Sequence, residues 1–207
     1  MSGNGSIDDT VILDAAASVF ATKGFSGARV DEIASRAGVN KAMLYYRVGD
    51  KKELYRRVVL RGQAAFRGAL EDALEASPDG RGALAEILRK ISEKVFSDDL
   101  MPSIILRELA DRGRTLPAEG LEGIRGFMAT VRSVVERGIG DGSFRPVDPV
   151  ALQFCVIGAL FTLALSRDLR RELQPAAPGP LTAGDASAAL LDLLADGLFE
   201  YTKGDRP

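Results

Sequence analysis

The sequence of 207 residues contains no histidine and a single cysteine, Cys155. Without histidine the chain cannot form a Ser-His-Asp or Cys-His catalytic group, or any zinc site with a histidine ligand. One cysteine excludes an intrachain disulfide and a four-cysteine metal site, and it suits a reducing compartment. We therefore predict that the protein has no catalytic residue, no metal and no cofactor, and that it is not an enzyme.

The sequence also lacks a long hydrophobic segment. Residues Met1–Ser6 are small and polar, without the basic and apolar regions of a signal peptide. The uncharged run Val150–Ser166 falls short of the roughly 20 residues that cross a bilayer. It follows Asp148-Pro149, a pair typical of a helix N-cap and first helical residue. We predict a cytoplasmic protein without a membrane partner, in which this run is a helix of the interior or of an interface.

Charge is distributed unevenly along the chain. The net charge is −2, yet residues 1–61 have ten Lys and Arg against seven Asp and Glu. Seven of these cations lie close together, opposed only by Asp50 and Glu53: Lys41, Arg47, Lys51, Lys52, Arg56, Arg57 and Arg61. Such a basic segment in an otherwise acidic chain indicates an anionic partner for one end of the molecule, although a solvated helix face has the same composition.

Most of the chain shows helical periodicity, with Gly, Pro and Asp between the helical runs. No alternating run of strand length is bounded by hairpin turns. We therefore predict an all-α fold. About nine helices are expected, at residues 7–22, 30–37, 41–48, 50–76, 82–97, 102–111, 118–138, 148–169 and 185–201.

The first three of these helices form a helix-turn-helix pattern. The second and third are separated by the short segment Ala37–Asn40, in which Gly38 permits a sharp reversal. Leu44 and Val48 lie four residues apart on the third helix and are expected to face inward. The opposite side then carries Lys41, Ala42, Tyr45 and Tyr46.

That outward side has the chemistry of a DNA contact. Phenol and ammonium groups donate hydrogen bonds to phosphate oxygens, and an Ala42 methyl or a tyrosine ring can contact a thymine methyl. Lys41 can donate to guanine, whereas Asn40 can pair with adenine or cap the helix. The alternative is a three-helix packing module whose tyrosines belong to the core, but two adjacent tyrosines of a helix cannot both face inward.

Residues 30–48, VDEIASRAGVNKAMLYYRV, and residues 50–54, DKKEL, carry a family resemblance. Together with Phe20, Gly24-Phe25 and the long helix that follows, they resemble the N-terminal domain of the tetracycline-repressor (TetR) family. The resemblance covers about the first quarter of the chain. It implies a dimeric transcriptional regulator, in most members a repressor, whose C-terminal domain binds a small molecule and dimerises.

The resemblance also implies which residues contact DNA: Asn40, Lys41, Ala42, Tyr45, Tyr46, Arg47 and Lys51. Arg29 stands where many members have Ser or Thr before the second helix, so it loses a side-chain cap but can itself meet a phosphate. Arg47 replaces a frequent histidine, and Gly49 replaces a common lysine. The implied organisation is a helix-turn-helix DNA-binding domain at 1–54, followed by a helical effector-binding and dimerisation domain at 55–207.

Dimerisation and effector binding are expected in the remainder of the chain. A helix-turn-helix unit reads few base pairs, so two copies are needed on a palindromic operator. The helices at 148–169 and 185–201 are candidates for a four-helix dimer interface, or else are core helices. Residues 82–138 would hold the effector pocket, whose contacts stay unassigned. Candidates for its lining, each of which can equally be core, are Phe66, Leu70, Phe96, Ile104, Leu109, Phe127, Val131 and Phe154.

The sequence thus predicts a dimeric regulator, a repressor released from double-stranded operator DNA by a small-molecule effector. The alternative is a helical protein-interaction module that does not bind DNA. An enzyme would need a titratable cluster, and the densest acidic group, around Asp98-Asp99, Glu108 and Asp111, has the pattern of a cap and of surface charges. Arg107 and Glu108 are expected either to meet a polar ligand or to face solvent.

Overall fold

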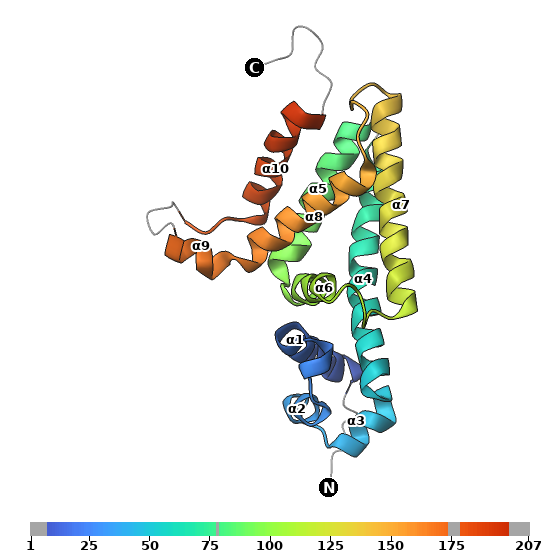
Figure 1. Ribbon diagram of the computed structural model, residues 1–207, viewed down its shortest axis with the longest axis vertical. Helices are drawn as coiled ribbons and strands as arrows, with labels where there is room; N and C mark the ends of the chain where they lie inside the picture. The colour runs from blue at the N-terminus through green and yellow to red at the C-terminus, as the bar shows by residue number, and fades with distance from the viewer. Residues whose placement is uncertain (1–7, 78, 174–178, 199–207) are drawn as a thin grey trace. The chain divides into compact units, whose positions relative to one another are not determined.

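The computed structural model describes residues 8–77, 79–173 and 179–198. These residues form ten helices and no strand (Figure 1), so the predicted all-α fold is confirmed. The helices are α1 (Asp9–Gly27), α2 (Val30–Arg36), α3 (Lys41–Val48), α4 (Lys51–Ala76), α5 (Gly80–Ser97), α6 (Leu100–Ala110), α7 (Ala118–Gly140), α8 (Pro149–Leu165), α9 (Arg167–Leu173) and α10 (Ala183–Leu198).

Ten helices replace the expected nine because the run predicted at 148–169 is two helices. α8 ends at Leu165, and the hydroxyl of the C-cap residue Ser166 donates to the carbonyl of Leu163. A serine side chain bonded to its own backbone in this way competes with the helical hydrogen bonds. The charged segment that follows forms α9, which has no buried residue.

The chain divides into two compact units. The first unit comprises residues 1–63 and 100–121, and the second comprises residues 64–99 and 122–207. Helices α4 and α7 each contribute residues to both units. The boundary after residue 54 was predicted from function, as the end of the DNA-binding domain, and not from compactness. It stays a prediction.

The first unit is built around the apolar side of α1. This helix packs against α2 and α6, and α2 packs against α3. Ile12, Phe20, Ile33 and Leu44 are almost completely buried. The ring of Phe20 meets Tyr55 of α4 edge-on, with the two centroids 4.8 Å apart. The start of α4 therefore shares one core with the three N-terminal helices.

In the second unit α10 packs along α5, and α8 contacts both helices (Figure 1). Helices α5 and α7 approach each other closely. A Cβ atom added to Gly80 would lie only 2.3 Å from the Cα atom of Gly138. Only glycine fits such a close approach of two backbones. The carboxylate of Asp141 accepts the Gly80 N–H at 2.8 Å. The first turn of α5 is thereby fixed against the end of α7.

Helix α8 is apolar on its exposed side as well as on its buried side. Leu152, Val156 and Leu160 are buried, whereas Phe154 keeps 53% of its surface exposed. Among the helices of residues 8–77, 79–173 and 179–198, none is by itself long and apolar enough to cross a membrane. Only α8 and α9 together reach that length and composition, and they bend by 72° at their junction.

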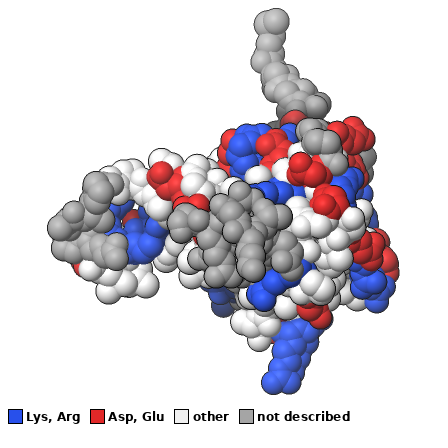
Figure 2. All heavy atoms as spheres, turned by 90° about the horizontal axis from the view of Figure 1, so that it is seen from above, with Lys and Arg blue, Asp and Glu red and all other residues white. Residues whose placement is uncertain are grey.

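Charges of both signs are mixed on the surface. Figure 2 shows Lys and Arg interspersed with Asp and Glu on the face drawn there, without one continuous patch of either sign. Local pairs such as Arg125 with Glu122 are typical of the chain. Charge alone therefore does not mark this face as a surface for a polyanion.

Candidate nucleic-acid interface and ligand cavity

The turn between α2 and α3 has the geometry that the sequence predicts. Gly38 adopts a φ of 68°, in the left-handed region that favours glycine. The N–H of Val39 donates to the carbonyl of Ala34 at 3.0 Å and closes the end of α2. Asn40 then caps α3, since its side-chain oxygen accepts the N–H of Met43 at 2.7 Å. The chain thus reverses within four residues and starts α3 with the N–H of Met43 capped.

The two sides of α3 differ in exposure. Leu44 and Val48 are buried against the rest of the first unit. Lys41, Ala42, Tyr45 and Tyr46 are exposed, and Tyr46 keeps 89% of its surface in contact with solvent. The alternative in which these tyrosines belong to the core is therefore wrong. A cation, a small residue and two phenols share the outward side of α3.

Lys41 has an acidic partner on the neighbouring helix. Its ammonium lies 2.9 Å from the carboxylate of Asp31 on α2, and this carboxylate raises the pKa of Lys41. Both side chains are at least half exposed. An ion pair in water contributes little to stability, so Lys41 can exchange Asp31 for a phosphate oxygen at small cost.

Arg47 forms an ion pair with Asp9, a partner that the sequence analysis did not predict. Asp9 at the start of α1 accepts from Arg47 at 3.2 Å and from Arg57 at 2.8 Å. These two guanidinium groups lower the pKa of Asp9, Arg57 most strongly. Arg57 also donates to the main-chain carbonyl of Arg47 at 3.3 Å. The end of α3 is thereby tied to α1 and α4 through one shared aspartate.

Lys51 and Arg29 lie at the ends of helices. The Lys51 ammonium lies 4.7 Å from the centre of the Phe25 ring and 3.4 Å from the carbonyl oxygen of Ser26. Its partial burial lowers its pKa. Arg29 is the N-cap residue of α2, and its exposed side chain forms no capping hydrogen bond.

Five of the seven cations in the basic segment form ion pairs within the first unit: Lys41, Arg47, Arg56, Arg57 and Arg61. Arg61, for example, pairs with Asp14 of α1 at 2.6 Å. Two of these pairs, Arg57 with Asp9 and Arg61 with Asp14, join α4 to α1. This structural use of arginine explains part of the composition that the sequence alone associates with an anionic partner.

The expectation for Arg107 and Glu108 is wrong for Glu108, which is buried, whereas the side chain of Arg107 lies at the surface. Arg107 donates to the main-chain carbonyls of Ala21 and Thr22, both at 2.7 Å, and so fixes α6 to α1. Glu108 is 6% exposed and accepts hydrogen bonds from the hydroxyl groups of Tyr55 and Thr115. Within the acidic group of Asp98-Asp99, Glu108 and Asp111, Glu108 is therefore internal and is not the predicted surface charge, whereas Asp99 and Asp111 are exposed.

Tyr55 likewise differs from the other tyrosines near the basic segment. It is 3% exposed and packs against Phe20 and Phe25. Burial, followed by the hydrogen bond to Glu108, raises its pKa strongly. Tyr55 thus belongs to the core that supports α3, while Tyr45 and Tyr46 lie on the surface.

The second unit contains an apolar cavity of about 20 Å³ between α5, α7 and α8. Its walls include Ile87 and Ile91 of α5 and Phe127 and Val131 of α7. The latter two were among the predicted pocket residues, whereas Phe154, another of them, is exposed on α8. The cavity also has Gln153 of α8 in its wall, a residue that sequence reasoning did not select.

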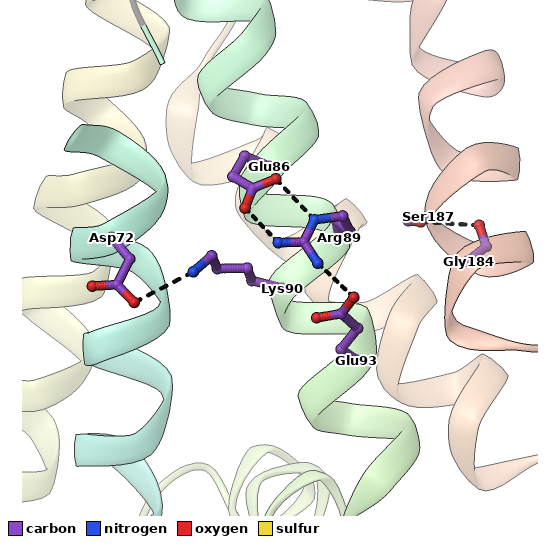
Figure 3. Close-up of polar contacts among 7 residues, drawn as sticks. All are labelled: Asp72, Glu86, Arg89, Lys90, Glu93, Gly184 and Ser187. Atoms are coloured by element: carbon purple, nitrogen blue, oxygen red, sulfur yellow. Dashed lines mark hydrogen bonds and ion pairs between the residues drawn. The ribbon is translucent and has the colours of Figure 1, made fainter. Parts of the chain in front are cut away.

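A larger, open cleft of about 550 Å³ lies between α5 and α10. Its charged side chains are already paired, as Figure 3 shows: Arg89 bonds to Glu86 and to Glu93 at 2.5 Å each. The hydroxyl of Ser187 donates to the carbonyl of Gly184 at 2.9 Å. The charged and polar side chains of the cleft therefore already have hydrogen-bond partners within the protein.

Comparison with known proteins bears on the first unit most directly. Residues 12–58 match the family model described as bacterial regulatory proteins, tetR family. The HTH-type transcriptional repressor NicS of Pseudomonas putida is 27% identical over 151 residues, which cover 72% of this chain and 71% of that protein. The HTH-type transcriptional activator FasR of Mycolicibacterium smegmatis is 40% identical over 73 residues, covering 35% of this chain and 33% of that protein.

The whole fold has counterparts among solved structures. The ketosteroid transcriptional regulator KstR2 of Mycobacterium tuberculosis superimposes with a TM-score of 0.76 at 20% identity, over 97% of this chain and 99% of that one. At this identity the similarity concerns the fold alone. The matched proteins are named as transcriptional regulators, and none of those named here is an enzyme.

Proposed function

Because the chain belongs to the TetR family of bacterial regulatory proteins, we propose that it is a dimeric repressor of transcription in the cytoplasm, which a small-molecule effector releases from a palindromic operator. Residues 1–54 are the DNA-binding part, and residues 55–207 bind the effector and dimerise. The observation that carries this proposal is the outward side of α3, where the highly exposed Tyr46 lies beside Tyr45 and Lys41.

In the proposed complex α3 enters the major groove of double-stranded DNA. The hydroxyl groups of Tyr45 and Tyr46 donate to phosphates, Ala42 allows close approach to the bases, and Lys41 leaves Asp31 for a guanine or a phosphate. Arg29, Arg47 and Lys51 contact the backbone on either side. Asn40, already committed as the α3 cap, contacts DNA from the start of that helix.

Two copies of α3 must act together. Half-sites of a palindrome lie about 34–36 Å apart, or a multiple of this, so the two protomers must be joined at a fixed spacing. The exposed apolar side chains of α8 and α10 support a dimer formed through these helices: Val150 is 40% exposed, Phe154 53% and Leu193 76%. Burial of such groups against a second copy removes them from water.

The effector acts through the second unit. Its cavity between α5, α7 and α8 is the proposed binding site. A ligand that repacks this unit changes the spacing of the two α3 helices in the dimer, since α4 is continuous from one unit into the other. An effector that favours the spread form by about 3 kcal/mol lowers operator affinity roughly 100-fold.

Fluorescence anisotropy with labelled promoter fragments tests this function. We expect salt-dependent binding to a fragment from the protein's own locus that contains an inverted repeat, and weaker binding to a scrambled fragment of equal length. Equal binding to both fragments, or none at low salt, would contradict the proposal and favour a protein-interaction module.

A further inference from the structure

Arg107 of α6 binds the last turns of α1. Gly24 has a φ of 69° and a ψ of 175°, so the regular helix is interrupted at this residue. The guanidinium of Arg107 donates to the carbonyls of Ala21 and Thr22, just before the interruption, at 2.7 Å each. Carbonyls near a helix end lack intrahelical donors and carry partial negative charge, which a guanidinium compensates. Arg107 therefore caps α1 from another helix.

Glu108, the next residue of α6, binds the start of α4. Its Oε1 accepts hydrogen bonds from the hydroxyl groups of Tyr55 and Thr115. Tyr55 lies near the beginning of α4, and its ring packs against Phe20 and Phe25. Two adjacent residues of α6 thus hold two different helices of the first unit (Figure 1).

These two attachments lie on either side of the helix-turn-helix. Residues 28–50, which contain α2 and α3, connect the end of α1 to the start of α4. Because α6 holds both of these ends, it fixes the two points at which the segment is attached. Helix α6 lies outside residues 1–54, yet it belongs to the same compact unit.

The attachments are polar, although an apolar contact would hold the helices without burying a carboxylate. Glu108 is 6% exposed, and its Oε2 has no hydrogen-bond partner in the described parts of the chain. Burial of a carboxylate lowers stability, and more so when one of its oxygens is unpaired. Hydrogen bonds are directional, however, whereas hydrophobic contacts are not. Local departures from the most stable choice are typical of residues that determine a functional geometry.

We propose that Arg107 and Glu108 are positioning residues for operator binding, which hold α3 in the orientation that fits the major groove. Arg107 acts through the end of α1 and Glu108 through Tyr55, and neither contacts DNA. The proposal rests on the DNA-binding function proposed above and adds α6 to the part of the chain that this function needs. Loss of either attachment frees one end of residues 28–50 and lowers operator affinity.

Arg107→Ala is the main test. Fluorescence anisotropy of the full chain with the inverted-repeat fragment gives the dissociation constant over a range of salt concentrations. We expect the constant to rise at least about tenfold, because two charge-assisted hydrogen bonds are lost, and its salt dependence to keep the wild-type slope. Arg107→Lys keeps the charge and should recover part of the affinity. A slope reduced by about one would mean that Arg107 itself contacts a phosphate, and would overturn the proposal.

Two control variants separate positioning from charge and from stability. Arg114→Ala removes another exposed cation from the first unit and should keep wild-type affinity. Val134→Ala creates space in the core of the second unit, so it should lower the free energy of unfolding and leave operator affinity unchanged. If Arg107→Ala is less stable but binds the operator like the wild type, or if Arg114→Ala loses as much affinity, the positioning role is wrong.

The second attachment is tested with Glu108→Gln and Glu108→Ala. Glutamine retains an oxygen that accepts from the two hydroxyl groups, whereas alanine removes both hydrogen bonds. We therefore expect about a tenfold loss of operator affinity for the alanine variant and less than about a threefold change for the glutamine variant. If Glu108→Ala does not fold, Tyr55→Phe removes the same hydrogen bond from the other side and takes its place. Equal affinities of the alanine and glutamine variants would overturn the role of Glu108.

Hydrogen exchange of the free protein tests the positioning without DNA. Amides of residues 28–50 should exchange faster in Arg107→Ala than in the wild type, whereas those of α5 and α8 should not change. Faster exchange in 28–50, in a protein whose wild type does not prefer the operator fragment, counts against the regulator function alone. Operator preference that Arg107→Ala retains, with unchanged exchange in 28–50, counts against the positioning role alone.

Discussion

Helices α3 and α8 both expose aromatic side chains, but the neighbours of these side chains differ. On α3, Tyr46 is accompanied by another phenol and by Lys41, all of which donate hydrogen bonds. On α8, Phe154 is accompanied by Val150, and no charged residue occurs between Pro149 and Leu165. A surface of donors gains by meeting an anion, whereas an apolar surface gains by excluding water. This difference supports our proposal that α3 meets DNA and that α8 meets a second copy of the chain.

The largest effect is expected from a charge placed on the apolar surface. Phe154→Asp should convert the dimer into a monomer in analytical ultracentrifugation. Operator affinity should fall by more than about 100-fold, because the two half-sites no longer act together. Leu109→Asp is the control, since Leu109 is exposed to a similar degree, 51% against 53%, but lies on α6. A dimeric Phe154→Asp protein would exclude this surface as the interface.

The next effect concerns α3 alone. Tyr46→Ala should lower operator affinity about tenfold, the amount expected for one lost polar contact, without changing dimerisation or helical content. Tyr46→Phe separates the hydroxyl from the ring, because it should lose the phosphate contact and keep the packing against DNA. If Tyr46→Ala binds the operator with wild-type affinity in anisotropy titrations, Tyr46 is not part of the DNA interface.

A substitution at Tyr55 compares a buried tyrosine with the exposed Tyr46. Tyr55→Phe removes a donor from the buried Glu108 carboxylate, so the free energy of unfolding should fall by about 1–3 kcal/mol. The exposed variant Tyr46→Phe should change it by less than about 0.5 kcal/mol. Urea denaturation followed by circular dichroism measures both. Equal stabilities of the two variants would mean that the hydrogen bond to Glu108 is dispensable.

A smaller effect is expected at the partner of Lys41. Asp31→Asn removes the carboxylate that occupies the ammonium and repels phosphate, so operator affinity should rise a few-fold at low salt. The gain should shrink as salt is added. In the Lys41→Ala background the same change should have less effect, because no ammonium remains to be released. Reduced affinity of Asp31→Asn would show that Lys41 does not turn toward DNA.

The smallest effect is a pH dependence at Asp9. Arg57 and Arg47 lower the pKa of this carboxyl group in the folded state. The stabilisation from ionised Asp9 is therefore fully present above about pH 4, the pKa of an aspartate in the unfolded chain. It is lost as the pH falls through the lower pKa of the folded state. Wild type should be more stable than Asp9→Asn at neutral pH, and the two should converge in acid. A constant difference in urea denaturation from pH 7 to pH 2 would contradict this role.

Local patterns in the sequence predicted the helix-turn-helix with its turn at Gly38, its cap at Asn40 and its two-sided third helix. Each of these depends on residues within a few positions of one another. Glu108 and Arg47 were beyond such reasoning, because their partners Tyr55 and Asp9 lie 53 and 38 residues away. A charged residue in an apolar stretch gives no sign of whether a distant hydroxyl or carboxylate will meet it.

The same limit applies to the second unit. Helical spacing indicated apolar helices there, but it could not distinguish the cavity residues Phe127 and Val131 from the exposed Phe154. That distinction depends on how α5, α7 and α8 pack. The residues that contact DNA and the boundary after residue 54 stay predictions, since they depend on a partner as well as on the fold.

The most direct measurement is a footprint of the full-length protein on DNA from its own locus, combined with the stoichiometry of the complex. We expect two protected half-sites with centres about 34–36 Å apart or a multiple of this, two chains per duplex, and loss of protection with Tyr46→Ala. Protection of a single unrepeated site by one chain, or protection that Tyr46→Ala leaves intact, would contradict the account.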